Sequence, residues 1–141
     1  MIPTDYCILV AEDNEILRYV TSKALSRRGY CVIEAADGNE AMQREAEYDG
    51  NIHVLITNVD MPGIKGHDLA RQMKAKRPDM KVLIVSGEDE RDFPQEARSH
   101  DSALLKPVTS ETILETVARL LKEFEDLKQA GSFTGRKESD A

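Results

Sequence analysis

Short apolar runs alternate along the chain with stretches in which apolar residues recur every three or four positions. A short apolar run that ends in polar or turn residues predicts a buried strand, and the intervening spacing predicts helices. Alternation of this kind is typical of an α/β protein, in which right-handed crossovers place helices on both faces of a parallel sheet. The sequence therefore predicts a doubly wound sheet of five parallel strands, at 6–11, 30–35, 53–58, 81–85 and 103–105.

The helices expected between these strands differ in the strength of their pattern. The first begins after Asn14 and carries apolar residues at helical spacing until Gly29, and the second covers about 39–48. The third ends before Pro78, whereas 88–100 is charged, contains Pro94 and has the weakest helical pattern. The last helix covers about 110–129, with one apolar face made of Ile113, Val117, Leu120, Phe124 and Leu127.

The domain organisation follows from this pattern and from the length of the chain. A chain of 141 residues is long enough to bury one core. The sequence contains no internal repeat and no sign of a second domain. The last residues are polar and include two glycines, a composition typical of disorder. We therefore predict one domain over 1–129 and a disordered tail over 130–141.

The segment 53–63 places a polar residue at the end of a buried strand. Its apolar run stops at Asn58, Asp60 follows, and Met61-Pro62-Gly63 predicts a turn. In open α/β sheets, ligands bind beyond the carboxyl ends of the strands. Asn58 therefore stands where chemistry is expected.

Charge and cysteine content narrow the possible classes of protein. The chain has 26 acidic and 19 basic side chains, a net charge of −7, and no basic stripe, which argues against direct nucleic-acid binding. It shows neither a signal peptide nor an apolar run of about 18 residues, so we expect a cytoplasmic protein without a membrane partner. Cys7 and Cys31 lie in apolar runs, and we expect buried, reduced thiols rather than a disulfide or metal site.

Polar residues with distinct chemistry follow four of the predicted strands. Adjacent carboxylates near a backbone carbonyl suit Mg²⁺, while a hydroxyl and a lysine suit the oxygens of a phosphoryl group. The nucleophile is missing, because attack on phosphorus would require a carboxylate in place of Asn58. The residues concerned are Glu12, Asp13, Asn58, Asp60, Ser86 and Lys106.

Five motifs in order give the chain a family resemblance. It resembles the receiver domain of bacterial response regulators over about 5–125, which implies a flavodoxin-like fold with strand order 2-1-3-4-5. The resemblance also implies a signalling module rather than an enzyme. Its partners would be a histidine kinase or phosphotransfer protein and a downstream protein target. The motifs are Ile-Leu-Val-Ala-Glu12-Asp13, Ala36-Asp37-Gly38-Asn39-Glu40-Ala41, Met61-Pro62-Gly63, Val-Ser86-Gly87 and Lys106-Pro107.

The resemblance also implies a role for each matching residue. The carboxylates of Glu12 and Asp13, with the backbone carbonyl of Asp60, would hold Mg²⁺. Ser86 and Lys106 would bind the phosphoryl group. Three residues would shape the loops of the site: Pro62, Gly63 and Pro107, of which Pro107 often follows a cis bond in the family.

Asn58 departs from the family because it occupies the position of the phosphoaccepting aspartate. The amide keeps the shape of a carboxylate but lacks its charge, so phosphorylation should fail there and Mg²⁺ should bind more weakly. Removing a unit charge about 4 Å from a cation costs up to about 4 kcal/mol at an effective dielectric constant near 20. Asn58 could be an engineered substitution or natural, and Asp60 is an alternative acceptor. Thr57 is less favoured, because it should point to the opposite face.

Three functions remain open from the sequence alone. The first is a phosphorelay receiver that accepts a phosphoryl group if residue 58 is natively Asp. The second is a natural pseudo-receiver that binds a protein without phosphate. The third, a small metal-dependent phosphotransfer enzyme, lacks a nucleophile and a second general acid. The kinase, the target, the oligomeric state and whether the chain is part of a hybrid sensor stay undetermined.

A few further residues carry expectations of their own. Ala103 stands where the family often has an aromatic switch residue, so that switch is in doubt. The three histidines, His53, His67 and His100, are expected to be surface or loop residues rather than phosphate carriers. On the last helix, Phe124 and Leu127 either pack on the sheet or extend past it to meet a partner or form a weak homodimer.

Overall fold

A five-stranded parallel sheet forms the centre of the molecule in the computed structural model, which describes residues 6–94 and 99–130. Its strand order is β2-β1-β3-β4-β5, and every neighbouring pair is parallel. This confirms the predicted doubly wound, flavodoxin-like sheet and its order. The strands are β1 (Cys7–Ala11), β2 (Cys31–Ala35), β3 (Val54–Asn58), β4 (Lys81–Ser86) and β5 (Ser102–Leu105).

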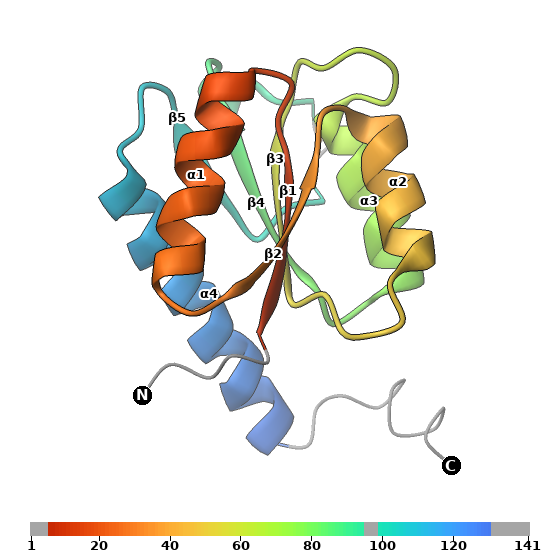
Figure 1. The fold of residues 1–141 in the computed structure, drawn as a ribbon, viewed down its shortest axis with the longest axis vertical. Coiled ribbons are helices and arrows are strands. Elements are labelled where there is room, and N and C mark those ends of the chain that lie inside the picture. The colour runs from red at the N-terminus through yellow and green to blue at the C-terminus, as the bar shows by residue number, and fades with distance from the viewer. Residues whose placement is uncertain (1–5, 95–98, 131–141) are drawn as a thin grey trace.

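Within the described ranges, four α-helices cover the two faces of this sheet. Helices α1 and α4 lie on one face, and α2 and α3 lie on the other (Figure 1). Because the connections between parallel strands cross over a face, α1, α2 and α3 each start near the carboxyl end of one strand and end near the amino end of the next, whereas α4 follows the last strand. The helices are α1 (Glu15–Arg27), α2 (Gly38–Glu47), α3 (Gly66–Lys76) and α4 (Ser110–Gln129).

The core has two layers, one on each face of the sheet. Successive side chains of a strand point to opposite faces, so Leu9 belongs to the layer under α2 and α3, and Ile8 and Val10 belong to the layer under α1 and α4. All five residues of β1 are buried, as expected for a strand covered on both faces. Burial of each large apolar side chain contributes about 1.5–3 kcal/mol.

The crossover from β4 to β5 differs from the prediction. Instead of a helix over 88–100, the described part holds one 3-10 turn, Glu90–Asp92, and residues 95–98 lie outside the described ranges. Phe93 anchors the segment, because it is buried with its ring against those of His67 and His100. Charged residues and Pro94 provide no apolar helical face here, which explains the weak pattern.

Side-chain caps fix where three of the helices begin. The side chains of Asn14, Asp37 and Thr109 accept hydrogen bonds from the backbone N–H groups of Leu17, Glu40 and Thr112, and so start α1, α2 and α4. Such caps satisfy N–H groups that have no partner inside the helix. They also hold the first turns of α1 and α2 beside the carboxyl ends of β1 and β2.

The apolar pattern of α1 does not mark a buried face along its whole length. Leu25 is fully buried near the end of the helix, but Ile16 is 74% exposed, and Leu17 and Val20 are more than 40% exposed. Tyr19 is also exposed, at 61%. The first two turns of α1 therefore present apolar side chains to solvent, next to the carboxyl ends of the strands.

The other apolar expectations have mixed outcomes. Phe124 is buried and its ring packs on that of His53, so it belongs to the core, whereas Leu127 is 41% exposed. His53 lies in the loop before β3, but it is buried and its Nδ1 accepts a hydrogen bond from the backbone N–H of Cys7.

The predicted tail, apart from Ala130, lies outside the described residues. Among the residues that are described, every helix is too short or too polar to span a membrane.

Candidate functional site

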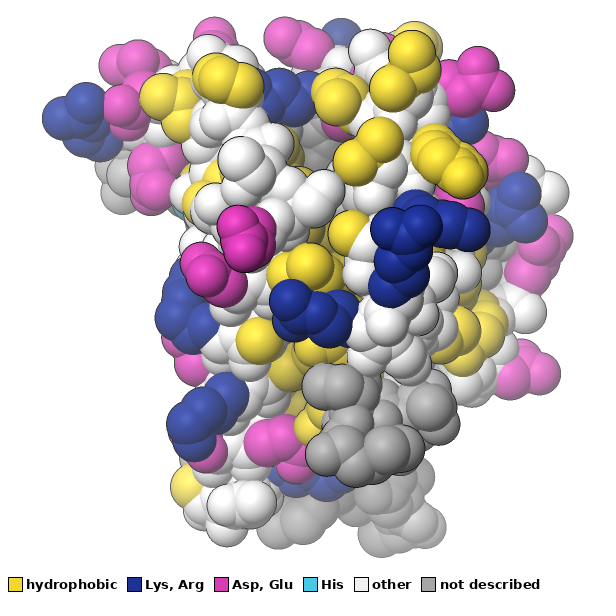
Figure 2. Space-filling view, turned by 60° about the vertical axis from the view of Figure 1, so that its left-hand side comes forward, with side chains coloured by type: hydrophobic (Ala, Val, Ile, Leu, Met, Phe, Trp, Pro, Cys, Tyr) yellow, Lys and Arg dark blue, Asp and Glu magenta, His cyan; other side chains and the backbone are white. Residues whose placement is uncertain are grey.

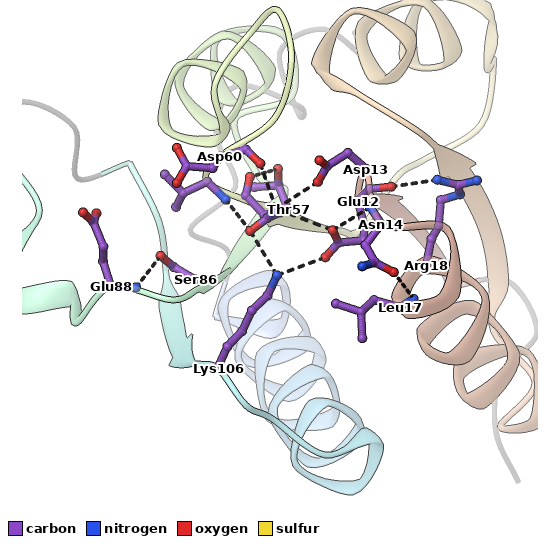
Figure 3. A network of polar contacts seen from close by, with 12 residues as sticks. Glu12, Asp13, Asn14, Leu17, Arg18, Thr57, Asp60, Ser86, Glu88 and Lys106 are labelled. Carbon is purple, nitrogen blue, oxygen red and sulfur yellow. Dashed lines mark hydrogen bonds and ion pairs between the residues drawn. The ribbon is translucent and has the colours of Figure 1, made fainter.

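The carboxyl ends of three strands bring together the residues that the sequence singled out (Figure 3). Glu12 and Asp13 directly follow β1, Asn58 ends β3, and Lys106 directly follows β5. Their side chains and the backbone carbonyl of Asp60 are joined by hydrogen bonds or ion pairs. We call these five residues the Asn58 cluster.

The amide nitrogen of Asn58 donates to the acidic half of the cluster. Nδ2 lies 2.9 Å from the carbonyl oxygen of Asp60, 3.1 Å from Oδ1 of Asp13 and 3.5 Å from Oε2 of Glu12. These three oxygens are the ones that the family resemblance assigns to a magnesium ion. In this structure they surround an uncharged N–H donor.

The amide oxygen of Asn58 faces the basic half of the cluster. Oδ1 accepts a hydrogen bond from the backbone N–H of Val59 at 3.0 Å and one from Nζ of Lys106 at 3.3 Å. Turning the amide by half a revolution would place its NH₂ group against two donors and its oxygen against acceptors. The surrounding groups therefore fix the orientation of the amide.

Glu12 is the most buried ionisable group of the cluster, with 8% exposure. Its carboxylate accepts a hydrogen bond from the backbone N–H of Asn14 at 3.0 Å, and Oε1 lies 3.5 Å from Nζ of Lys106. Its backbone carbonyl accepts a hydrogen bond from the guanidinium of Arg18 at 2.8 Å. The start of α1 thus holds Glu12 in place. The sequence pattern did not single out Arg18, although its place in the first turn of α1, shortly after the acidic pair, was a signal for it.

The turn after β3 presents the Asp60 carbonyl. Met61 is buried and anchors this turn, Pro62 is exposed, and Gly63 has φ +76°, a conformation that favours glycine. Gly66 begins α3 so close to β3 that an added Cβ would lie 2.2 Å from the carbonyl oxygen of Asn58. The first turn of α3 therefore packs directly on the end of β3.

Ser86 lies near the cluster but outside its hydrogen-bonded group. It is 3% exposed, and its hydroxyl accepts a hydrogen bond from the backbone N–H of Glu88 at 2.9 Å (Figure 3). Its backbone carbonyl accepts a hydrogen bond from the N–H of Lys106 at 2.7 Å. The Lys106–Pro107 peptide bond is cis. Ser86 therefore positions the backbone of Lys106, while its own side chain is engaged elsewhere.

The two alternative acceptors have different surroundings. Thr57 is fully buried and its hydroxyl donates to the backbone carbonyl of Asn58, on a strand whose alternate residues face opposite layers. Asp60 is exposed, and it is its carbonyl oxygen that joins the cluster.

Ala103 is partly buried in the layer under α2 and α3, where its methyl group has no alternative rotamer to adopt.

An apolar groove opens beside the cluster, between α1 and the start of α4. Its volume is about 430 Å³, and Leu17, Val20, Val108 and Ile113 contribute apolar walls. Figure 2 shows the hydrophobic side chains along this face of the molecule. Lys106 lines this groove and is also a member of the Asn58 cluster. The groove therefore opens directly onto the cluster.

The cluster as arranged does not fit a divalent cation. Mg²⁺ requires oxygen ligands in near-octahedral geometry, but the nitrogen of Asn58 occupies the position that faces all three oxygens. Within residues 6–94 and 99–130, no three His, Cys, Asp or Glu side chains gather as a metal site. A cation could enter only after the Asn58 amide turns or moves away.

Comparison with known proteins identifies the family. The model of the response regulator receiver domain matches residues 8–118. The chain belongs to the response regulator receiver domain family. Receiver domains act in two-component signalling, with histidine kinases or phosphotransfer proteins as partners, and they are generally signalling modules rather than enzymes. The family assignment confirms the resemblance that the five sequence motifs indicate.

Individual relatives and structures agree with this assignment. Sensor kinase CckA of Brucella abortus (strain 2308) is 33% identical over 120 residues, which are 82% of this chain and 12% of that protein. A response regulator receiver domain protein from Clostridium thermocellum superposes with a TM-score of 0.78 at 27% identity, covering 86% of this chain and 98% of that one. The response regulator TrrA from Thermotoga maritima, solved in complex with Mg(2+)-BeF, gives 0.72 at 25% identity, with 82% and 98% covered.

The curated relatives first matched are much longer than the matched region. This chain spans 12%, 31% and 17% of the lengths of three of them: a sensor kinase, a cyclic di-GMP phosphodiesterase and a DNA-binding transcriptional regulator. The likeness therefore covers the receiver domain that these proteins share.

Proposed function

We propose that this receiver domain acts in two-component signalling without accepting a phosphoryl group at position 58. The observation that carries this proposal is the Asn58 amide, whose nitrogen and oxygen are both hydrogen-bonded within the cluster. An amide has no anionic oxygen to attack phosphorus. The domain would signal by occupying a partner, as a pseudo-receiver.

A second candidate applies if residue 58 is aspartate in the native protein. The carboxylate at that position would then accept the phosphoryl group from a histidine kinase with the help of Mg²⁺, held by Glu12, Asp13 and the carbonyl of Asp60. Lys106 and Ser86 would bind the phosphoryl oxygens. The intact surroundings of Asn58 favour this candidate, because the acids and the lysine already converge there.

Intact-mass measurement after incubation with acetyl phosphate and Mg²⁺ separates the two candidates. The chain with Asn58 should gain no phosphoryl mass. A gain in the Asn58→Asp variant alone would assign the site to an inactivated receiver, and no gain in either form would assign it to a phosphate-independent binding module. A gain in the chain with Asn58 would overturn the proposal, and Asp60→Asn would then show whether Asp60 is the acceptor.

The partner would dock on the first two turns of α1. Ile16, Leu17, Tyr19 and Val20 expose large apolar side chains there, and two of them line the groove that leads to Lys106. Exposed apolar residues gathered around a polar site mark protein interaction surfaces. A histidine kinase or phosphotransfer protein that presents a phosphohistidine to position 58 would cover this surface, as would a downstream target.

Binding measurements with purified histidine kinases can test this surface. Val20→Asp should weaken a binding kinase at least about tenfold, because a charge placed in an apolar contact must be desolvated. Leu127→Asp is the matched control, because Leu127 is similarly exposed at the far end of α4. An equal loss of kinase affinity in both variants would show that α1 is not the docking surface. A weak homodimer remains a separate prediction, tested by concentration-dependent sedimentation.

A further inference from the structure

Two thiols lie side by side at the end of the sheet opposite the Asn58 cluster. Cys7 and Cys31 are the first residues of β1 and β2 and are direct partners across these parallel strands. Their sulfur atoms are 3.1 Å apart, and both cysteines are free. Neighbouring strands are about 4.8 Å apart, which lies within the Cα separation of about 4.4–6.8 Å that a disulfide spans.

The two sulfurs differ in access. Cys7 is 1% exposed, and burial, followed by its hydrogen bond to Cys31, raises its pKa to about 12. Cys31 is only partly buried, because β2 is at the edge of the sheet. The hydroxyl of Tyr48, which follows α2, lies 3.8 Å from the Cys31 sulfur. A reagent from solvent therefore meets Cys31 first.

We propose that Cys7 and Cys31 form a redox modification site that low-molecular-weight disulfides convert into an intramolecular disulfide. The geometry that carries this proposal is the direct pairing of the two residues across β1 and β2, with one thiol accessible and the other held against it. The site is independent of the function proposed for the Asn58 cluster.

The reaction takes place in two exchange steps. The Cys31 thiolate attacks a sulfur of oxidised glutathione and forms a mixed disulfide, and one glutathione thiolate leaves and takes up a proton. The sulfur of Cys7 then attacks the Cys31 sulfur, and the second glutathione leaves with the Cys7 proton. The protein is oxidised by two electrons, and one oxidised glutathione becomes two reduced molecules. Its raised pKa leaves little of the Cys7 thiol ionised near neutral pH, so the second step relies on the contact between the two sulfur atoms, which are 3.1 Å apart.

A disulfide at this place would be reversible. Because Cys31 is only partly buried, a reductant can reach the bridge from solvent, and exposed disulfides are more easily reduced. Thioredoxin or dithiothreitol should therefore restore both thiols.

Thiol titration and intact mass of the full chain test the proposal. After incubation with excess oxidised glutathione, the unmodified chain should lose both thiols and two hydrogen atoms and retain no glutathione. Peptide mapping without reduction should locate the link between Cys7 and Cys31. Retention of a glutathionyl group on Cys31, or survival of both thiols, would overturn the proposal.

Two variants separate the roles of the thiols. Cys7→Ser should stop at the mixed disulfide and gain one glutathionyl group, because Cys31 has lost the thiol that resolves it. Cys31→Ser should show no reaction in the native state, because Cys7 is buried. Circular dichroism confirms that each variant is folded, and Cys7→Ala replaces Cys7→Ser if serine disrupts the core. Rapid modification of Cys7 in folded Cys31→Ser would contradict the assigned order.

Discussion

The two ends of the parallel sheet both carry polar groups, but these groups are satisfied in different ways. At the carboxyl ends, Asn58 and Lys106 are half-buried and bond mainly to side chains of other loops. At the amino ends, Arg77 bonds to the carboxylate of Glu45 and to the backbone carbonyls of Tyr48 and Gly50. The first set can rearrange when a ligand arrives, while the second holds α3 to the loop that follows α2.

This contrast indicates which end of the sheet can change its contacts when a ligand binds and which end stabilises the fold. Groups that bond to each other near solvent can exchange partners with water or an ion at moderate cost. A buried carboxylate whose partner is removed cannot do so, and that loss is expensive. We therefore expect substitutions at the carboxyl ends to change binding, and those at the amino ends to change stability.

The largest expected effect is on metal affinity at the carboxyl ends. Asn58→Asp should raise the affinity for Mg²⁺ by up to about 4 kcal/mol, or about a thousandfold in Kd, because it adds a charge next to the cation. The same variant should be less stable without Mg²⁺, because Glu12 and Asp13 then face a third carboxylate. Metal titration by calorimetry measures the first change and urea unfolding the second. An unchanged affinity for Mg²⁺ would contradict the expectation that substitutions at the carboxyl ends change binding.

The next effect lies at the amino ends. Arg77→Met should lower the free energy of unfolding by about 3 kcal/mol, because Glu45 keeps a buried charge without its main partner. Arg71→Met is the matched control, because its pair with Asp68 is more than half exposed on both sides and should contribute less than about 1 kcal/mol. Urea denaturation measures both variants. Equal losses of unfolding free energy in the two variants would contradict the expected difference between a buried and an exposed ion pair.

A smaller effect concerns the cap that starts α1 beside the Asn58 cluster. Asn14→Ala should lower the free energy of unfolding by about 1 kcal/mol, because the N–H of Leu17 loses the side-chain oxygen that accepts its hydrogen bond. Asn14→Gly should cost only about a few tenths of a kcal/mol, because glycine leaves that N–H open to water. Thermal unfolding of both variants measures the difference, and an equal cost would show that the cap is not its source.

The smallest effect is confined to one partly exposed carboxylate after β4. Hydrogen bonds from the side chain and the backbone of Arg91 lower the pKa of Asp89 from 3.8 to about 2. A lowered folded-state pKa means that this contact favours the fold above pH about 4 and is lost as the pH falls towards 2. NMR titration of the Asp89 carboxyl measures the pKa. In Arg91→Gln it should return towards 3.8, and a value near 3.8 in the unmodified chain would contradict the contact.

The sequence predicted the sheet well because its signals are local. Each strand is a short apolar run, and the polar residue that ends it marks the rim where the site lies, as with Asn58 and Lys106. The helix expected over 88–100 is not found in the described part of that stretch, which holds one 3-10 turn, and Phe93 anchors this turn by packing on His67 of α3 and on His100. Contacts of that kind depend on the tertiary structure.

The details of the site depended on geometry that residue types do not contain. The sequence placed Ser86 with Lys106, but the Ser86 hydroxyl bonds to the N–H of Glu88. It could not show which atom of the Asn58 amide faces the acids, because that choice follows from Val59 and Lys106. The apolar residues of α1 also matched a core pattern, although Leu17 and Val20 line the groove beside the site and are exposed.

The close packing of Gly66 on the end of β3 has a mechanical consequence. With no space for even one carbon atom between this glycine and the Asn58 carbonyl, the backbone at position 58 and the start of α3 must shift together. Any ligand that pushes on residue 58 therefore also pushes on a helix whose other end is fastened by Arg77. We therefore expect a displacement of residue 58 to reach the start of α3 first, while Arg77 holds the other end of this helix in place.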